Sequence, residues 1–189
     1  IEILGMDMKN RAIEIKRRIG VAPDEPKIYE HLKGYEFLEF IMSIYKLDKV
    51  EMKTKIEELC DAFEVDYLDK LAGEMSHGMR QKLMLISVLM RKPEVLFLDE
   101  PTVGLDAKSA KILKELLVKY AREGTTVFMT THILEIAEKM CDRIAIINKG
   151  QIIAEASVSE LKEKYRASLE DIFLSLTATN DIKDIVDSL

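Results

Sequence analysis

Cysteine is scarce in this sequence, since Cys60 and Cys141 are the only two among 189 residues. They stand far apart along the chain and lack the short spacing that zinc ligands have. We therefore expect two reduced, buried thiols in a cytosolic protein, and no metal site built on cysteine.

Long apolar runs are missing as well. Residues 1–5 form a short apolar piece followed by charges, which is not the pattern of a secretory signal. The longest apolar stretch, 83–90, contains Ser87 and is far shorter than the roughly 20 apolar residues of a spanning helix. If the protein serves a membrane, we expect it to do so through a partner.

The sequence has no excess of positive charge. It carries 28 lysines and arginines against 34 acids, a formal net charge of -6. This balance argues against nucleic acid as the main partner, but it leaves a nucleotide possible because one phosphate site is local. With 48% hydrophobic and 33% charged residues, the composition is that of a globular protein with a core.

Short runs typical of strands alternate with segments typical of helices, which predicts an α/β fold. The middle of the chain, 34–91, has no strand signal and indicates a helical lobe inserted in the α/β frame. Strands are predicted at 1–4, 19–22, 95–98, 126–130, 143–147 and 151–154. Helices are predicted at 11–18, 35–45, 50–63, 79–90, 107–121, 133–140 and 169–176.

Two acids stand at the end of an apolar run. Asp99 and Glu100 follow Val95-Leu96-Phe97-Leu98 and precede Pro101. Open α/β sheets bind ligands at the carboxyl ends of their strands, so Asp99 could hold Mg²⁺ through water and Glu100 could deprotonate an attacking water. Taken alone, the pair is also consistent with a solvated loop.

A hydroxyl and a glycine open another predicted helix, in Met75-Ser76-His77-Gly78-Met79. Ser76 can cap the helix, and Gly78 allows a ligand to approach the backbone. The amides and the dipole at such a helix start suit an anion. The alternative is a helix cap with no ligand.

Two further residues have both a structural and a functional interpretation. His132 follows Thr130 and Thr131 at the end of a predicted strand and could donate to a phosphate oxygen. Asp106 stands where a helix begins, and is either an N-cap alone or also an interface residue facing a neighbouring subunit. For His132 the alternative is a structural histidine.

The order and spacing of these segments resemble the ATP-binding-cassette (ABC) ATPase family over nearly the whole chain. Residues 75–79 resemble its signature motif, 95–100 its Walker B motif, and 104–106 its D-loop. His132 matches the switch histidine, and 19–25 are similar to the Q-loop segment. Three segments resemble the multidrug, antibiotic and sodium export subunits of bacteria and archaea: the Asp-Glu-Pro loop at 99–101 with 28–30, the signature segment 75–83, and the closing segment 168–173.

The resemblance implies a fold and a set of roles. The fold is a RecA-like P-loop NTPase core at 1–33 and 92–156, a helical signature subdomain at 34–91 and a helical C-terminal extension at 157–189. Asp99 would hold Mg²⁺, Glu100 would be the catalytic base, and His132 would contact the γ-phosphate. The remaining implied nucleotide-binding residues are Ser76, His77, Gly78, Met79, Asp24 and Asp106.

The resemblance also implies partners. Ser76 and Gly78 would grip the γ-phosphate of ATP held by a second ATPase subunit, so the domains would act as head-to-tail dimers, homomeric or heteromeric. A transmembrane permease subunit would carry the substrate, which would place the protein in the cytoplasm, peripheral on the inner face of the cell membrane. Asp24, His77 and Met79 depart from the residues usual in the family.

One motif of the family is not found. A phosphate-binding loop needs G-x-x-x-x-G-K-[ST], and of the eight glycines only Gly73 and Gly78 have the required separation, followed by Met79-Arg80. We therefore expect an incomplete sheet that begins after this loop, and a chain that alone neither binds ATP tightly nor hydrolyses it. The alternatives are a non-catalytic dimerisation or regulatory module that has lost the loop, or a cassette protein of translation or DNA repair.

Overall fold

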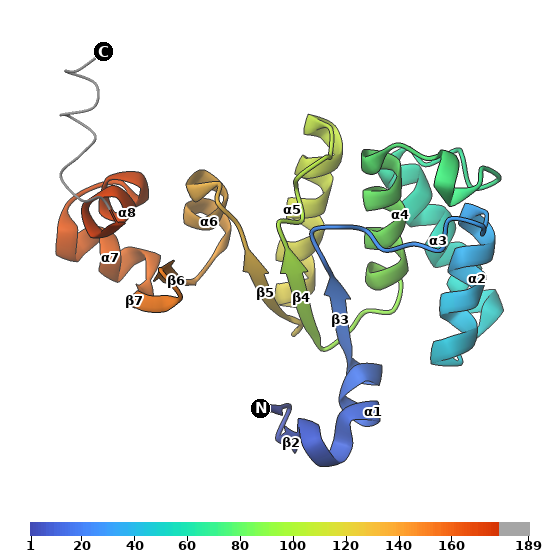
Figure 1. The fold of residues 1–189 in the computed structure, drawn as a ribbon, viewed down its shortest axis with the longest axis horizontal. Coiled ribbons are helices and arrows are strands. Elements are labelled where there is room, and N and C mark those ends of the chain that lie inside the picture. Colours follow the sequence, from blue (N-terminus) through green and yellow to red (C-terminus); the bar gives the residue numbers. More distant parts are fainter. Residues whose placement is uncertain (178–189) are drawn as a thin grey trace. The chain divides into compact units, whose positions relative to one another are not determined.

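A computed structural model describes residues 1–177 of the chain (Figure 1). Two compact units divide it, the first covering Ile1–Thr130 and the second beginning at Thr131. The sequence predicts a different division, into a core at 1–33 and 92–156, a helical subdomain at 34–91 and an extension at 157–189. That division stays a prediction. Residues 178–189, the end of the expected C-terminal extension, lie outside the described residues.

A parallel sheet of three strands forms the centre of the first unit. Strand β4 (Val95–Asp99) lies between β3 (Ile19–Ala22) and β5 (Thr126–Thr130), and all three point the same way (Figure 1). Leu96 and Leu98 of β4 are buried, as the near-continuous apolar run of a central parallel strand requires. Because the strands are parallel, their carboxyl ends share one edge of the sheet.

Helices α2 (Gly34–Tyr45), α3 (Lys49–Phe63) and α4 (His77–Leu89) form a lobe beside β3 (Figure 1). A short 3-10 helix, η1 (Ala72–Glu74), precedes α4. The second half of α4 is apolar on all sides and is buried along its length. This burial explains why a segment with little amphipathic pattern is nevertheless a stable helix.

Arg91 contacts both the helical lobe and the sheet. Its guanidinium lies over the Tyr45 ring at 3.8 Å, at the end of α2, and donates to the carbonyl oxygen of Ile19 at 3.1 Å. Burial lowers the pKa of Arg91, and the ring face and the carbonyl dipole compensate part of the lost hydration.

Helix α5 (Ala107–Arg122) crosses over between β4 and β5. The sequence spacing predicts one apolar face made of Ala110, Leu113, Leu117 and Tyr120. Leu113, Leu117 and Tyr120 are buried, and Ala110 is partly buried. The Tyr120 hydroxyl donates to the carbonyl of Leu89 at the end of α4, at 3.0 Å. Burial raises the pKa of Tyr120 to about 12, so this hydroxyl remains a donor at any physiological pH.

The first residues form a small antiparallel pair, β1 (Glu2–Ile3) and β2 (Met6–Asp7), followed by α1 (Met8–Arg18). Asp7 caps α1 by accepting from the Lys9 amide at 3.1 Å. The sequence predicts the strand and the helix here, but not the second short strand.

The second unit holds α6 (Leu134–Met140), the antiparallel strands β6 (Arg143–Asn148) and β7 (Gln151–Ser157), and the helices α7 (Val158–Tyr165) and α8 (Leu169–Thr177). The β6–β7 turn has positive φ at both central residues, Lys149 (48°) and Gly150 (77°), as the Asn-Lys-Gly sequence predicts for a tight hairpin. The unit has its own small core of Ala137, Ile146, Leu161, Leu169 and Ile172.

Several expectations can be compared with these elements. The predicted strands and helices occur at the predicted places, most within two residues, with β7 three residues longer. Of the two thiols, Cys60 is buried as expected, whereas Cys141 is only partly buried. None of the helices within residues 1–177 is long and apolar enough to cross a membrane.

Gln81 is an unusual residue in the core. Its side chain, on α4, is 1% exposed, and neither its amide nitrogen nor its oxygen has a hydrogen-bond partner among the described residues. An unpaired buried amide costs about 1–3 kcal/mol. We expect Gln81→Met, which keeps the length and removes the polar atoms, to increase the free energy of unfolding by an amount in this range.

Urea denaturation of the 189-residue chain measures this effect. The matched control is Gln151→Met on β7, where the glutamine is exposed and the change should stay within about 0.5 kcal/mol. A loss of stability in Gln81→Met would contradict the expectation, because it would show that the amide is satisfied in solution.

Candidate functional site

The carboxyl edge of the sheet gathers the predicted acids. Asp99 ends β4 and pairs in register with Thr130 at the end of β5, and the Thr130 hydroxyl donates to Asp99 Oδ1. Asp24 lies on the same edge, since it follows β3 by two residues and Ala22 pairs with Leu98. Both acids are exposed. The edge therefore presents carboxylates to solvent at the place where parallel sheets bind ligands.

Glu100 has a left-handed backbone conformation, with φ of 45°. Its amide donates to the carbonyl oxygen of Thr130 at 3.2 Å and to the hydroxyl of Thr130 at 3.3 Å. A non-glycine residue in this region costs of the order of 1–3 kcal/mol and persists only where neighbours hold it. Thr130 thus positions both acids, one through its side chain and one mainly through its backbone.

The start of α4 combines a side-chain cap with the amides of a first helical turn. Ser76 is the N-cap, and its hydroxyl accepts from the Met79 amide at 3.2 Å. His77 is exposed, and the amides of the first turn have no partner within the helix. The Tyr67 hydroxyl donates to the Met79 carbonyl at 3.2 Å, which fixes the first turn against the preceding loop. Such a helix start can bind a phosphate oxygen.

Gly78 and Gly104 bring this helix start against the loop that follows the acids. A Cβ at Gly78 would lie 2.5 Å from the carbonyl oxygen of Gly104. Gly104 has φ of 78°, and a Cβ there would lie 2.5 Å from Cδ2 of His77. The Gly104 backbone therefore leaves no room for a side chain at Gly78, whereas at Gly104 the neighbour is the His77 side chain and the positive φ is what favours glycine.

Asp106 joins the same loop to two helices. Its carboxylate caps α5 by accepting from the Ser109 amide and hydroxyl, each at 2.8 Å, which confirms the predicted N-cap. The other partner is Lys82 of α4, whose Nζ lies 2.7 Å from Asp106 Oδ2. The Lys82 ammonium, followed by the Ser109 donors, holds the pKa of Asp106 well below its usual range.

This lowered pKa gives a pH-dependent stability. A carboxyl group with a depressed folded-state pKa contributes stability that is fully present above its unfolded pKa, about 3.9, and is lost as pH falls through the folded value. We expect Asp106→Asn, which keeps the cap, to be less stable than the wild type at neutral pH, with the difference shrinking below about pH 4. Urea denaturation at a series of pH values measures it, and a difference that is constant into the acid range would contradict it.

His132 belongs to the second unit, where it is exposed two residues after the end of β5. Its role stays a prediction, as do the roles of the other site residues. Within residues 1–177 no group of three or more histidine, cysteine or acidic side chains could hold a metal ion. Mg²⁺ is commonly bound by one or two carboxylates together with substrate phosphates, so Asp99 fits a metal that arrives with its nucleotide.

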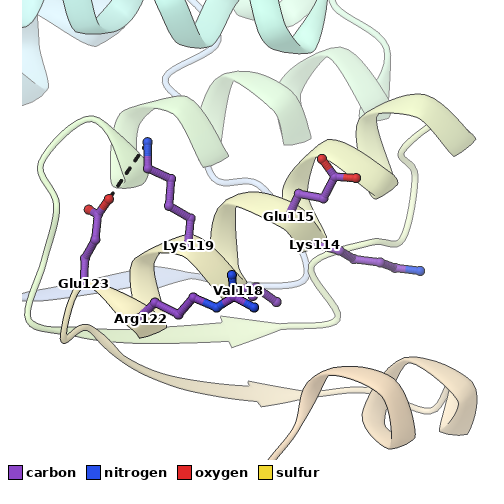
Figure 2. Close-up of a pocket in the computed structure, with 6 residues that line it drawn as sticks. All are labelled: Lys114, Glu115, Val118, Lys119, Arg122 and Glu123. Carbon is purple, nitrogen blue, oxygen red and sulfur yellow. Dashed lines mark ion pairs between the residues drawn. The ribbon is translucent and has the colours of Figure 1, made fainter.

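A pocket of 460 Å³ lies elsewhere, on the outer face of α5 (Figure 2). Figure 2 shows the side chains of the last turns of this helix, among them the ion pair between Lys119 and Glu123 at 3.9 Å. Asp106 lies at the opposite end of the helix. The pocket is therefore a charged helix face open to solvent. It lies away from the carboxyl ends of the strands, where the predicted acids are.

Sequence reasoning missed the partners that hold these residues. Lys82 follows Gly78 by four residues, so helical spacing indicates a shared face, but not that this face meets residues 104–106. The hydrogen bonds between Glu100 and Thr130 could be predicted only from the register of β4 and β5, which the sequence does not give. Asp99, Glu100 and Asp24 share one edge of the sheet, and Ser76, His77, Gly78 and Met79 lie with Asp106 around the start of α4.

Comparison with known proteins identifies the family. A family model described as ABC transporter matches residues 1–103. The ABC transporter ATP-binding protein NatA of Bacillus subtilis (strain 168) is 34% identical over 93% of this chain and 72% of its own length. The daunorubicin resistance ATP-binding protein DrrA3 of Streptomyces coeruleorubidus is 34% identical over 92% of this chain and 55% of its own. The chain spans about half the length of several curated relatives, 55% of DrrA3 and 48%, 45% and 47% of three others.

Solved structures agree with this result. The ATP-binding subunit of an ABC transporter has a TM-score of 0.88 at 26% identity, covering 94% of this chain and 75% of the other. A dimeric post-hydrolysis state of the ATP-binding cassette MJ0796, bound to ADP and phosphate, has a TM-score of 0.71 at 22% identity and shows the fold alone, over 83% of this chain and 72% of that one. The predicted fold class, a partial RecA-like fold with a parallel sheet, is confirmed. The chain belongs to the ABC transporter family, among its ATP-binding proteins.

Proposed function

We propose that the 189-residue chain is part of an ATP-hydrolysing subunit. This subunit works as a head-to-tail pair and powers export through a transmembrane permease. The observation that carries the proposal is the joint placement of Asp99 and Glu100 by Thr130 at the open edge of the parallel sheet. A module kept only for dimerisation has no need to hold Glu100 in a strained conformation.

Each side chain has one task in this proposal. Asp99 binds Mg²⁺, and Glu100 accepts a proton from the water that attacks the terminal phosphorus atom. His132 donates to an oxygen of the same phosphate. Asp24 lies on the same edge and supplies an oxygen towards the metal, with one methylene less reach than the glutamine or glutamate usual in the family.

The start of α4 serves the second subunit. Ser76 and Gly78, with His77 and Met79 beside them, bind the terminal phosphate of ATP held by the other chain. Asp106, which approaches the partner, reports whether that chain is in place. Because each site then needs residues from two chains, hydrolysis requires the dimer.

Residues 1–189 contain no G-x-x-x-x-G-K-[ST] sequence, whose amides and lysine cradle the β- and γ-phosphates in P-loop proteins. We propose that the full gene product supplies this loop outside the 189 residues, and that these residues alone neither bind ATP tightly nor hydrolyse it. Titration with a fluorescent ATP analogue tests the second point, and micromolar affinity of the isolated chain would refute it.

The test of the function uses the full gene product. We expect it to hydrolyse MgATP, to dimerise only with ATP, and to lose both properties when the 189 residues are expressed alone. ATP binding without hydrolysis, with the permease present, would overturn the proposal.

The absence of the phosphate-loop sequence favours one alternative, a non-catalytic dimerisation or regulatory module. The genomic DNA upstream of the codon for Ile1 separates the two possibilities. An in-frame glycine-rich loop supports the ATPase, and a start codon at this position supports the regulatory module.

Export is proposed from the relatives, whose names refer to daunorubicin resistance and to fluoroquinolone export. The proposed surface for the permease is the loop after β3 together with α2, where Tyr29 is 60% exposed and its ring meets Phe40 edge to face at 5.4 Å. Charge reversal at the exposed Glu25 or Glu30 should weaken transport. Unchanged transport in the assembled protein would argue against this surface.

A further inference from the structure

Lys82 lies where three elements of the first unit meet. From α4, its ammonium reaches Asp106 Oδ2 at 2.7 Å and donates to the carbonyl oxygen of Phe63 at 3.0 Å. Phe63 is the last residue of α3, whose carboxyl end carries the negative end of the helix dipole. The Lys82 side chain is only 14% exposed, so its charge is balanced by these two groups more than by water.

The same face of α4 meets the loop in a second place. Gly78 and Lys82 are four residues apart, and therefore neighbours on one helix face. Gly78 faces the carbonyl of Gly104, while Lys82 holds Asp106. The helix and the loop therefore meet in two places, through a close backbone approach at Gly78 and through an ion pair at Lys82.

We propose that Lys82 is a positioning residue that holds the start of α4 and the loop 104–106 together as one rigid piece. This inference rests on the proposed function, because the α4 start serves the nucleotide of the other chain while the loop follows the chain's own Asp99 and Glu100. A change at one nucleotide site then reaches the other through a fixed connection inside each chain.

Hydrogen exchange of the 189-residue chain tests the connection without nucleotide. The loop amides of Val103 and Leu105 donate to the carbonyls of Glu100 and Thr102, at 3.0 and 3.3 Å, and are suitable reporters. We expect Lys82→Met to speed their exchange about tenfold, Lys82→Arg to restore most of the protection, and Lys111→Met to have no effect. Lys111 is the matched control because its side chain on α5 is 79% exposed and its ion pair with Glu115 is long, at 4.0 Å. Unchanged exchange in a folded Lys82→Met chain would overturn the inference.

ATP hydrolysis by the full gene product tests its consequence. We expect Lys82→Met to lower the Hill coefficient for ATP towards one while the variant still binds ATP, with Lys82→Arg close to wild type. A general loss of stability would lower kcat in proportion to the folded fraction and leave the Hill coefficient unchanged, which would overturn the positioning role. If the wild-type protein has no ATPase activity, the proposed function fails, whereas the exchange experiment still decides whether Lys82 holds the loop.

Discussion

Glu100→Gln in the full gene product is expected to lower kcat for ATP hydrolysis by about 10²–10⁴-fold, the usual contribution of a general base. Glutamine keeps the size and polarity of the side chain, and the backbone hydrogen bonds to Thr130 do not involve the carboxylate. Binding of ATP should therefore be retained. We propose that ATP holds the two subunits together and that its hydrolysis releases them, so dimers with bound ATP should accumulate.

Two measurements made together check this expectation. Phosphate release gives kcat and KM, and size-exclusion chromatography in the presence of ATP gives the dimer. The control is Glu115→Gln, an exposed glutamate on α5 far from the strand ends, which should behave as wild type. Near wild-type hydrolysis by Glu100→Gln would remove Glu100 from the proposed mechanism.

Gly78→Ala is expected to destabilise the chain by about 1–3 kcal/mol, although alanine is the better helix former. The added Cβ would lie 2.5 Å from the carbonyl oxygen of Gly104, which is backbone and cannot rotate away. The propensity gain, at most about 1 kcal/mol and smaller in the first turn, does not offset this overlap. The loop must then shift, and with it the surface that the proposed dimer uses.

Urea denaturation of the 189-residue chain measures the loss, and ATP-dependent dimerisation of the full gene product should weaken at least about tenfold, the equivalent of 1.4 kcal/mol. Gly73→Ala is the matched control, because its Cβ would meet Glu30 at 3.3 Å, a contact that a small shift relieves. Equal stability of Gly78→Ala and wild type would mean that the helix start and the loop are not in close contact in solution.

The sequence predicts the elements well because their signals are local. Asp106 and Gly124 mark the ends of α5, and the apolar run before Asp99 marks a buried strand. The placement of Asp24 and Asp99 on one edge also follows once parallel strands are assumed. These features depend on residues close together in the chain.

Contacts between distant segments could not be predicted in the same way. Lys82 meets Asp106 across 24 positions, and Thr130 meets Asp99 across 31, so neither pair has a spacing that marks it. The second short strand, Met6–Asp7, is too brief to give a periodic signal. No sequence pattern predicts the buried amide of Gln81, which lacks a hydrogen-bond partner within residues 1–177 although polar side chains in a core are usually paired.

The left-handed backbone of Glu100 lowers the stability of the folded chain at the residue that the proposed hydrolysis needs. Glycine adopts this conformation without strain, so Glu100→Gly should give a chain that resists heat and denaturant better than the natural one. Any selection that rewards robustness alone would therefore favour removal of the acid that the proposed reaction needs. In a laboratory evolution experiment, this position would reveal whether hydrolysis is under selection.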